Sequence, residues 1–155
     1  MNKIFKILIL PVAVIIILGG FAGQAFAEPV PPLSVTFSTT PLFNVVNFLP
    51  GNEIIRTVGV SNNSATTQNV IVEAINAVDV GGLGDKLNLI IKEGDVILYS
   101  NKLGVFLRAG EVPLSVLSNN TNTTYSFNVT FENGANNDIQ NATLGFDVCV
   151  GFEGG

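Results

Sequence analysis

Tyr125-Ser-Phe-Asn-Val-Thr-Phe131 is the stretch of sequence that decides the fold class. Its large apolar residues alternate strictly with Ser, Asn and Thr, and this period of two is typical of a half-buried β-strand. The sequence Leu144-Gly-Phe-Asp-Val-Cys-Val-Gly-Phe152 repeats the pattern, with Leu, Phe or Val at every second position. Alternation with one polar face favours antiparallel sheets, because the strands of buried parallel sheets are apolar throughout.

Shorter strand patterns precede this pair, and Gly, Asn and Pro turn signals separate them. The region from Leu103 to Leu117 is ambiguous and allows a short helical turn. About eight or nine short strands predict a single antiparallel β-sandwich of the jelly-roll type, with a barrel as the alternative. The further expected strands are Leu33 to Ser38, Leu42 to Phe48, Ile54 to Val60, Val70 to Ile75, Leu87 to Ile91 and Val96 to Tyr99.

The first 27 residues have the three parts of a secretory signal peptide. Lys3 and Lys6 are followed by an apolar run and then by Ala25-Phe26-Ala27. The apolar run is shorter than the roughly 20 residues that a membrane-spanning helix needs. We therefore expect cleavage after Ala27, a secreted or cell-surface protein formed by residues 28–155, and no membrane attachment after cleavage.

The charge balance excludes several classes of partner. Without Lys3 and Lys6, the chain has five basic residues against 12 acidic ones. Nucleic-acid binding requires clustered Lys and Arg that neutralise phosphates, and the sequence contains no such cluster. We expect no nucleic-acid partner, and the same charge disfavours anionic lipid surfaces.

The residues that most enzymes need are missing. The chain has no histidine and one cysteine, Cys149, so it lacks Ser-His-Asp and Cys-His arrangements and a thiolate zinc site. Two carboxylates on expected strands, Glu73 and Asp147, are the candidates for carboxylate catalysis, but a small sheet protein usually has no deep cleft. We expect no enzymatic activity and no cofactor, and we interpret Cys149 as a small half-buried residue, with an intermolecular disulfide as the alternative.

Two further sets of polar residues are candidates for binding or modification. Calcium accepts oxygen ligands alone, so acidic residues near turns are weak calcium candidates, although no EF-hand loop is present. These acidic residues are Asp79, Asp85, Glu93 and Asp95. Export would also permit glycosylation at Asn-x-Ser/Thr sequences, unless these arise by chance in an Asn- and Thr-rich surface. The candidate acceptors are Asn62, Asn119, Asn122, Asn128 and Asn141.

The order of several short motifs resembles the camelysin/TasA-like family of secreted fibre-forming proteins. Asn52 stands where that family usually has an acidic residue. Some relatives are described as metallopeptidases, an activity that we do not transfer because histidine is absent. The motifs that carry the resemblance are Phe37-Ser38, Phe48-Leu-Pro-Gly-Asn52, Thr57-Val-Gly-Val-Ser-Asn62, Leu83-Gly-Asp-Lys-Leu87, Tyr125 to Phe131, Asn136-Asn-Asp-Ile-Gln140 and Leu144-Gly-Phe-Asp147.

This resemblance implies a jelly-roll subunit that polymerises with itself by donating an N-terminal strand to the next copy. In this chain the donor would be residues 28–37, anchored by Leu33, Val35 and Phe37, and its prolines would prevent it from pairing within its own subunit. The alternative is that Leu33 to Ser38 is the first strand of its own sheet. The rival function is a monomeric cell-surface module that binds a carbohydrate, such as a surface glycan, or a protein.

Overall fold

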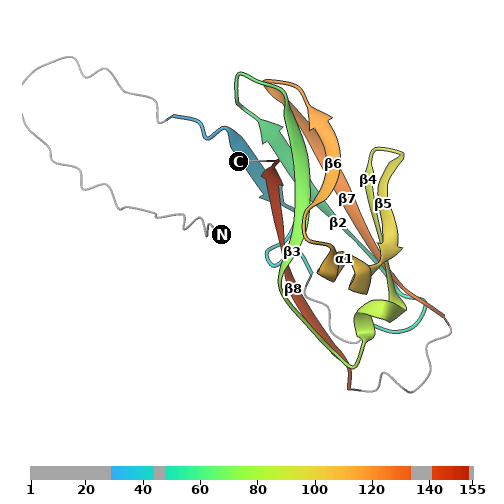
Figure 1. Cartoon of the computed structure of the whole chain (residues 1–155). Helices are drawn as coiled ribbons and strands as arrows, with labels where there is room; N and C mark the ends of the chain where they lie inside the picture. Colours follow the sequence, from blue (N-terminus) through green and yellow to red (C-terminus); the bar gives the residue numbers. More distant parts are fainter. Residues whose placement is uncertain (1–28, 44–47, 134–140, 154–155) are drawn as a thin grey trace, which may run out of the picture.

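The computed structural model describes residues 29–43, 48–133 and 141–153, so the expected signal peptide at 1–27 lies outside the described residues. Two antiparallel sheets pack face to face (Figure 1). This arrangement confirms the predicted β-sandwich, and the two sheets remain separate instead of closing into a barrel.

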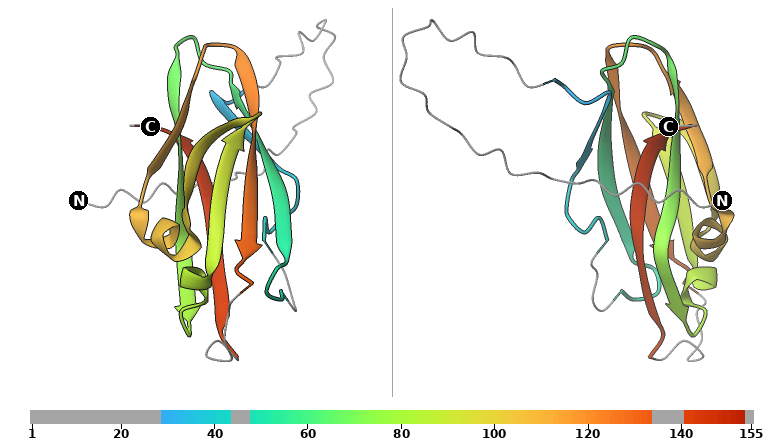
Figure 2. Two further views of the ribbon diagram at one scale, coloured as in Figure 1. Left: turned by 90° about the vertical axis from the view of Figure 1, so that its right-hand side faces the viewer. Right: turned by 60° about the vertical axis from the view of Figure 1, so that its left-hand side comes forward.

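The larger sheet has five strands and the smaller sheet has three (Figure 2). In the larger sheet the strand order is β1 (Leu33–Phe37), β2 (Glu53–Asn62), β7 (Thr121–Phe131), β4 (Leu87–Glu93) and β5 (Val96–Lys102). In the smaller sheet the order is β6 (Val112–Leu117), β3 (Gln68–Val80) and β8 (Thr143–Phe152).

Strands that are distant in sequence are neighbours in both sheets. Strand β2 pairs with β7 and β3 pairs with β8, so the chain wraps around the sandwich as in a jelly roll. The two sheets do not have four strands each, because β1 pairs with β2 in the larger sheet and not with β8 in the smaller one. As a result β8 lies at an edge of the smaller sheet.

The core lies between the sheets and follows the predicted alternation. Tyr125, Phe127, Val129 and Phe131 of β7 are all buried, and the intervening polar residues face outward. The hydroxyl of Tyr125 is 2.7 Å from the hydroxyl of Ser115 on β6, so the buried phenol has a hydrogen-bond partner. Apolar burial of about 25 cal/mol per Å² makes this inner face the main source of stability.

The ambiguous region from Leu103 to Leu117 divides into a helix and a strand. Helix α1 (Leu103–Ala109) ends at Gly110, whose positive φ of 72° favours glycine at this position. A short 3-10 helix, η1 (Leu83–Lys86), lies beside α1 at one end of the sandwich (Figure 1). The expected strand from Leu42 to Phe48 is wrong at its described positions, which lie outside any strand.

Asn62 is a fully buried polar residue that joins the two sheets. It lies at the end of β2, and its Nδ2 is 2.8 Å from the carbonyl of Thr66, 3.0 Å from that of Leu117 and 3.1 Å from that of Ser118. Its Oδ1 accepts hydrogen bonds from the backbone N–H and the hydroxyl of Ser64. The amide therefore links the end of β2 to the end of β6 and supplies a donor to the buried carbonyl of Leu117.

Replacing Asn62 should destabilise the fold. In Asn62→Ala the buried carbonyl of Leu117 loses the amide donor and the amide's other hydrogen bonds are lost with it, so we expect the free energy of unfolding in urea to fall by about 2–3 kcal/mol. The control is Asn122→Ala at an exposed position, which should change the free energy by less than about 0.5 kcal/mol. Equal effects of the two substitutions would show that the Asn62 amide does not stabilise the corner.

Candidate functional site

Strand β1 pairs with β2 of its own chain, at the edge of the larger sheet. Leu33 lies opposite Asn62, and Phe37 lies opposite Val58. The expectation that prolines prevent this pairing is therefore wrong for residues 33–37. Pro32 precedes the paired residues, and its carbonyl accepts a hydrogen bond of 2.8 Å from the backbone N–H of Asn63, so the prolines lead into the strand.

The three predicted anchors of β1 face the core. Leu33, Val35 and Phe37 are partly buried and pack against the buried cluster, whereas Thr36 is exposed. In the described part of the chain, β2 is the sole strand partner of β1. The strand is therefore held by one ladder and by three apolar side chains.

After β1, the chain turns toward β8. The backbone N–H of Ser38 donates to the carbonyl of Thr57 at 2.9 Å, and the hydroxyl of Ser38 accepts from the N–H of Thr57 at 3.0 Å. A half-open cavity of about 110 Å³ lies between Phe37, the segment 39–42 and β8. Strands β1 and β8 are therefore neighbouring edges on one side of the sandwich (Figure 2).

A second cavity opens at the end of the sandwich near η1 and has an apolar lining. Its volume is about 100 Å³. None of its lining side chains ionises, so it offers no acid, base or metal ligand. The lining residues are Phe43, Phe48, Ile54, Leu83, Leu87, Leu103, Val129, Leu144, Gly145 and Phe146.

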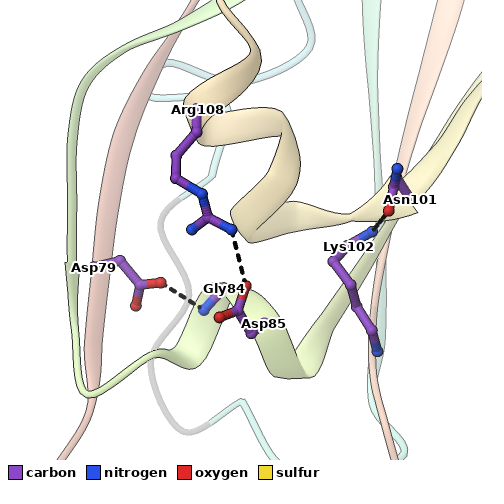
Figure 3. A network of polar contacts seen from close by, with 6 residues as sticks. All are labelled: Asp79, Gly84, Asp85, Asn101, Lys102 and Arg108. Carbon is purple, nitrogen blue, oxygen red and sulfur yellow. Dashed lines mark hydrogen bonds and ion pairs between the residues drawn. The ribbon is translucent and has the colours of Figure 1, made fainter.

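A polar cluster fastens α1 to η1 (Figure 3). The Oδ2 of Asp79 accepts a hydrogen bond of 3.1 Å from the N–H of Gly84, and Arg108 of α1 forms an ion pair of 3.3 Å with Asp85. Gly84 packs so closely on Gly104 that a Cβ on Gly84 would lie 2.9 Å from the Cα of Gly104. The cluster therefore holds α1 in close packing against η1.

A second ion pair lies near this cluster, between Lys102 and Glu132. The hydrogen bond from Lys102 is the main reason that the pKa of Glu132 is lowered. Lys102 also bonds through its backbone N–H to Asn101, at 2.8 Å (Figure 3). Because both side chains are substantially solvated, we assign this pair no role in a binding site.

The four weak calcium candidates do not converge on one site. Asp79 and Asp85 belong to the cluster beside η1, whereas Glu93 and Asp95 lie at the far end of β4. The seven residues of β4 span roughly 20 Å, which is too far for a shared ion. Among the described residues, no group of three or more His, Cys, Asp or Glu residues converges on a metal position.

The glycosylation candidates differ in accessibility. The prediction fails at Asn62, because its buried Nδ2 is already committed to backbone carbonyls and has no room for a glycan. Asn128 is half-buried and donates to Glu53. Asn119, Asn122 and Asn141 are exposed, so these three are the accessible acceptors.

Cys149 is exposed on the outer face of β8 and not half-buried as predicted. It lies opposite Glu73 of β3, and partial burial of the sulfur followed by the Glu73 charge raises the pKa of its thiol. The raised pKa reduces the thiolate fraction and so makes this thiol a weaker nucleophile than a free cysteine. Asp147 lines the cavity beside β1 but Glu73 does not, so the two candidate carboxylates share no cleft.

Comparisons with known proteins leave the family open. No protein-family profile and no curated protein matches the chain. Among solved structures, one match is AvmM, described as catalysing macrocyclization in alchivemycin A biosynthesis. It has a TM-score of 0.40 and 12% identity, with 78% of this chain and 74% of AvmM covered. Similarity this weak carries no argument about activity. In the described residues, no helix is long and apolar enough to cross a membrane.

The contact between η1 and α1 should be sensitive to a single methyl group. In Gly104→Ala the new Cβ would lie 3.1 Å from the carbonyl carbon of Gly84 and closer still to Asp85, so we expect a loss of about 1–3 kcal/mol. In the control Gly145→Ala the Cβ meets nothing within 4 Å, and stability should be almost unchanged. Thermal unfolding followed by circular dichroism makes the comparison, and equal stabilities would contradict the described packing.

The environment of Cys149 also makes a testable prediction. Removing the negative charge in Glu73→Gln should lower the pKa of the thiol and so increase the thiolate fraction and the reaction rate with Ellman's reagent at pH 8. The control is Asp95→Asn, which removes the same charge at the distant β4–β5 turn and should leave the rate unchanged. A rate that rises equally in both variants would show that net charge, and not the neighbour, controls the thiol.

Proposed function

We propose that the chain is a secreted structural subunit of an extracellular fibre, pilus or biofilm matrix, and that its subunits assemble by exchanging strand β1. One observation carries the proposal. The N-terminal strand lies at a sheet edge, pairs with β2 and directs Leu33, Val35 and Phe37 into the core. Such a strand can leave its own sheet and take the equivalent place in a neighbour.

The exchange is plausible energetically because it replaces each contact by an identical one. The same main-chain bonds to β2 and the same apolar pockets are available in the next copy. Each subunit would give its strand to one neighbour and receive a strand from another. Such head-to-tail contacts generate a filament when the rotation between successive subunits does not close a ring.

The N-terminal sequence and the motif order support the same function. Residues 1–27 have the pattern of a secretory signal, and the motifs from Phe37 to Asp147 resemble those of the camelysin/TasA-like family. Without histidine, and with a weakly nucleophilic Cys149, the chain has little to offer catalysis. We accordingly propose a non-enzymatic protein at the cell surface or in the surrounding matrix.

A second candidate function is a monomeric binding module. It is favoured by the pairing of β1 with β2 in the single chain, which makes a complete sandwich without a partner. It is disfavoured by the aromatic residues, because no Phe or Tyr in the described ranges belongs to the strongly exposed apolar residues. A stacking site for a sugar ring usually needs an exposed aromatic side chain.

The exchange predicts a disulfide between different chains. Thr36 lies opposite Gly59, and a Cβ on Gly59 would be 3.9 Å from the Cβ of Thr36, which suits a disulfide. Chains with Thr36→Cys and chains with Gly59→Cys, both in a Cys149→Ser background, are mixed, assembled and oxidised. We expect disulfide-linked dimers that contain one chain of each kind.

A matched chain carrying both Thr36→Cys and Gly59→Cys is the control. Exchange predicts that it forms a ladder of covalent multimers on non-reducing gels, whereas a monomeric module would form an internal disulfide alone. Filaments that contain no bond between position 36 and position 59 of different chains would contradict strand exchange.

A further inference from the structure

The short segment that follows β1 fastens this strand to the opposite sheet. Residues 39–43, here called the strap, pack against β8 of the smaller sheet. Leu42 is 6% exposed and belongs to the hydrophobic core, and the ring of Phe43 lies 5.7 Å from the ring of Phe146 on β8. The hydroxyl of Thr39 donates to the carbonyl of Leu42 at 3.0 Å, so the strap forms a compact turn. The strap therefore connects β1, in the larger sheet, to an edge of the smaller sheet.

The strap limits how far β1 can move while Leu42 stays buried. Leu42 is the fifth residue after Phe37, the end of β1, and a chain of that length spans at most about 18 Å. Successive subunits of a filament lie about one domain diameter apart, roughly 30 Å. If the strap detaches while Phe48 keeps its stacking contact with Phe131, eleven residues are free and the reach rises to about 38 Å. A docked strap therefore confines β1 to its own subunit, and a detached strap does not.

The packing that holds the strap is incomplete. The cavity of about 110 Å³ lies between the strap, Phe37 and β8, and Phe43 and Phe146 also line the cavity of about 100 Å³ near η1. Side chains around a cavity lose dispersion contacts, so a contact flanked by two cavities is weaker than one in a close-packed core. The strap contains no ionisable residue and is held by apolar packing. It is therefore a contact that can open while the rest of the core stays closed.

We propose that the strap is an autoinhibitory lock, which keeps β1 in its own subunit and sets the rate at which β1 becomes available for exchange. The ladder between β1 and β2 is the same before and after exchange, so it does not by itself favour the closed subunit. The contact between the strap and β8, in contrast, must open before β1 can reach a neighbour. The role of the lock in assembly rests on the proposed strand exchange, whereas the lock itself is a property of the single chain.

Hydrogen exchange of β1 in the monomer tests the lock without requiring filaments. The full chain is expressed from Met1, its monomeric fraction is isolated by size-exclusion chromatography at low concentration, and deuterium uptake of peptides covering residues 33–37 is followed by mass spectrometry. Leu42→Ala removes the buried anchor of the strap, so we expect β1 to exchange about tenfold faster. Val148→Ile adds a methyl group to the cavity beside the strap, and this should slow the exchange about fourfold.

Leu107→Ala is the matched control. Leu107 of α1 is a partly buried leucine that packs against the same core, but α1 lies beside β5, at the opposite edge of the larger sheet from β1. This substitution lowers the global stability and leaves the strap intact, so β1 should exchange at the wild-type rate through its own local opening. Unchanged exchange of β1 in Leu42→Ala, or an equal increase in Leu107→Ala, would overturn the proposal.

The same variants separate the lock from the fibre. Filament growth of the wild type and of Leu42→Ala is followed by light scattering and negative-stain microscopy, and we expect Leu42→Ala to shorten the lag before growth. Faster hydrogen exchange of β1 in Leu42→Ala, with no filaments from any chain, would support the lock and reject assembly by strand exchange. Filaments that grow equally fast from both chains, with equal hydrogen exchange of β1, would reject the lock and leave the assembly standing.

Discussion

The strict alternation of β7 is the constraint on which the rest of the structure depends. This strand is hydrogen-bonded on both sides, to β2 and to β4, so each of its side chains must face either the core or the solvent. Tyr125 and Phe127 enter the core with almost no exposure. Thr124 and Ser126 are thereby forced outward, and one sequence pattern determines both the packed interior and the polar outer face.

The strands in which buried and exposed positions alternate regularly could be predicted from the local sequence. The strands around Phe127 and Phe146 were predictable because a period of two reports one buried face. Asn62 could not be predicted in the same way, since its burial depends on carbonyls near residue 117 that become its neighbours only in the folded chain. The helix at Leu103 was predictable only as a possible short turn in an ambiguous region, because its packing depends on the contact between Gly84 and Gly104.

The candidate site, too, could be predicted only in part. The apolar anchors of β1 were predictable from alternation, whereas its pairing with β2 is a property of the sheet and corrects the interpretation of the prolines. The acidic residues near turns were proposed from composition alone, and the length of β4 separates Asp85 from Asp95. A position near a turn in the sequence therefore does not predict that acidic residues meet at one site. The topology of the strands determines which turns lie close together.

The central claim is that β1 joins subunits by strand exchange. The most direct measurement is negative-stain microscopy, with size-exclusion chromatography, of a chain that begins at Glu28 and of one that begins at Ser38. The account predicts filaments from the longer chain, a folded soluble shorter chain, and suppression of filaments by excess peptide spanning residues 28–37. Identical filaments from both chains, or monomers from both at every concentration, would contradict it.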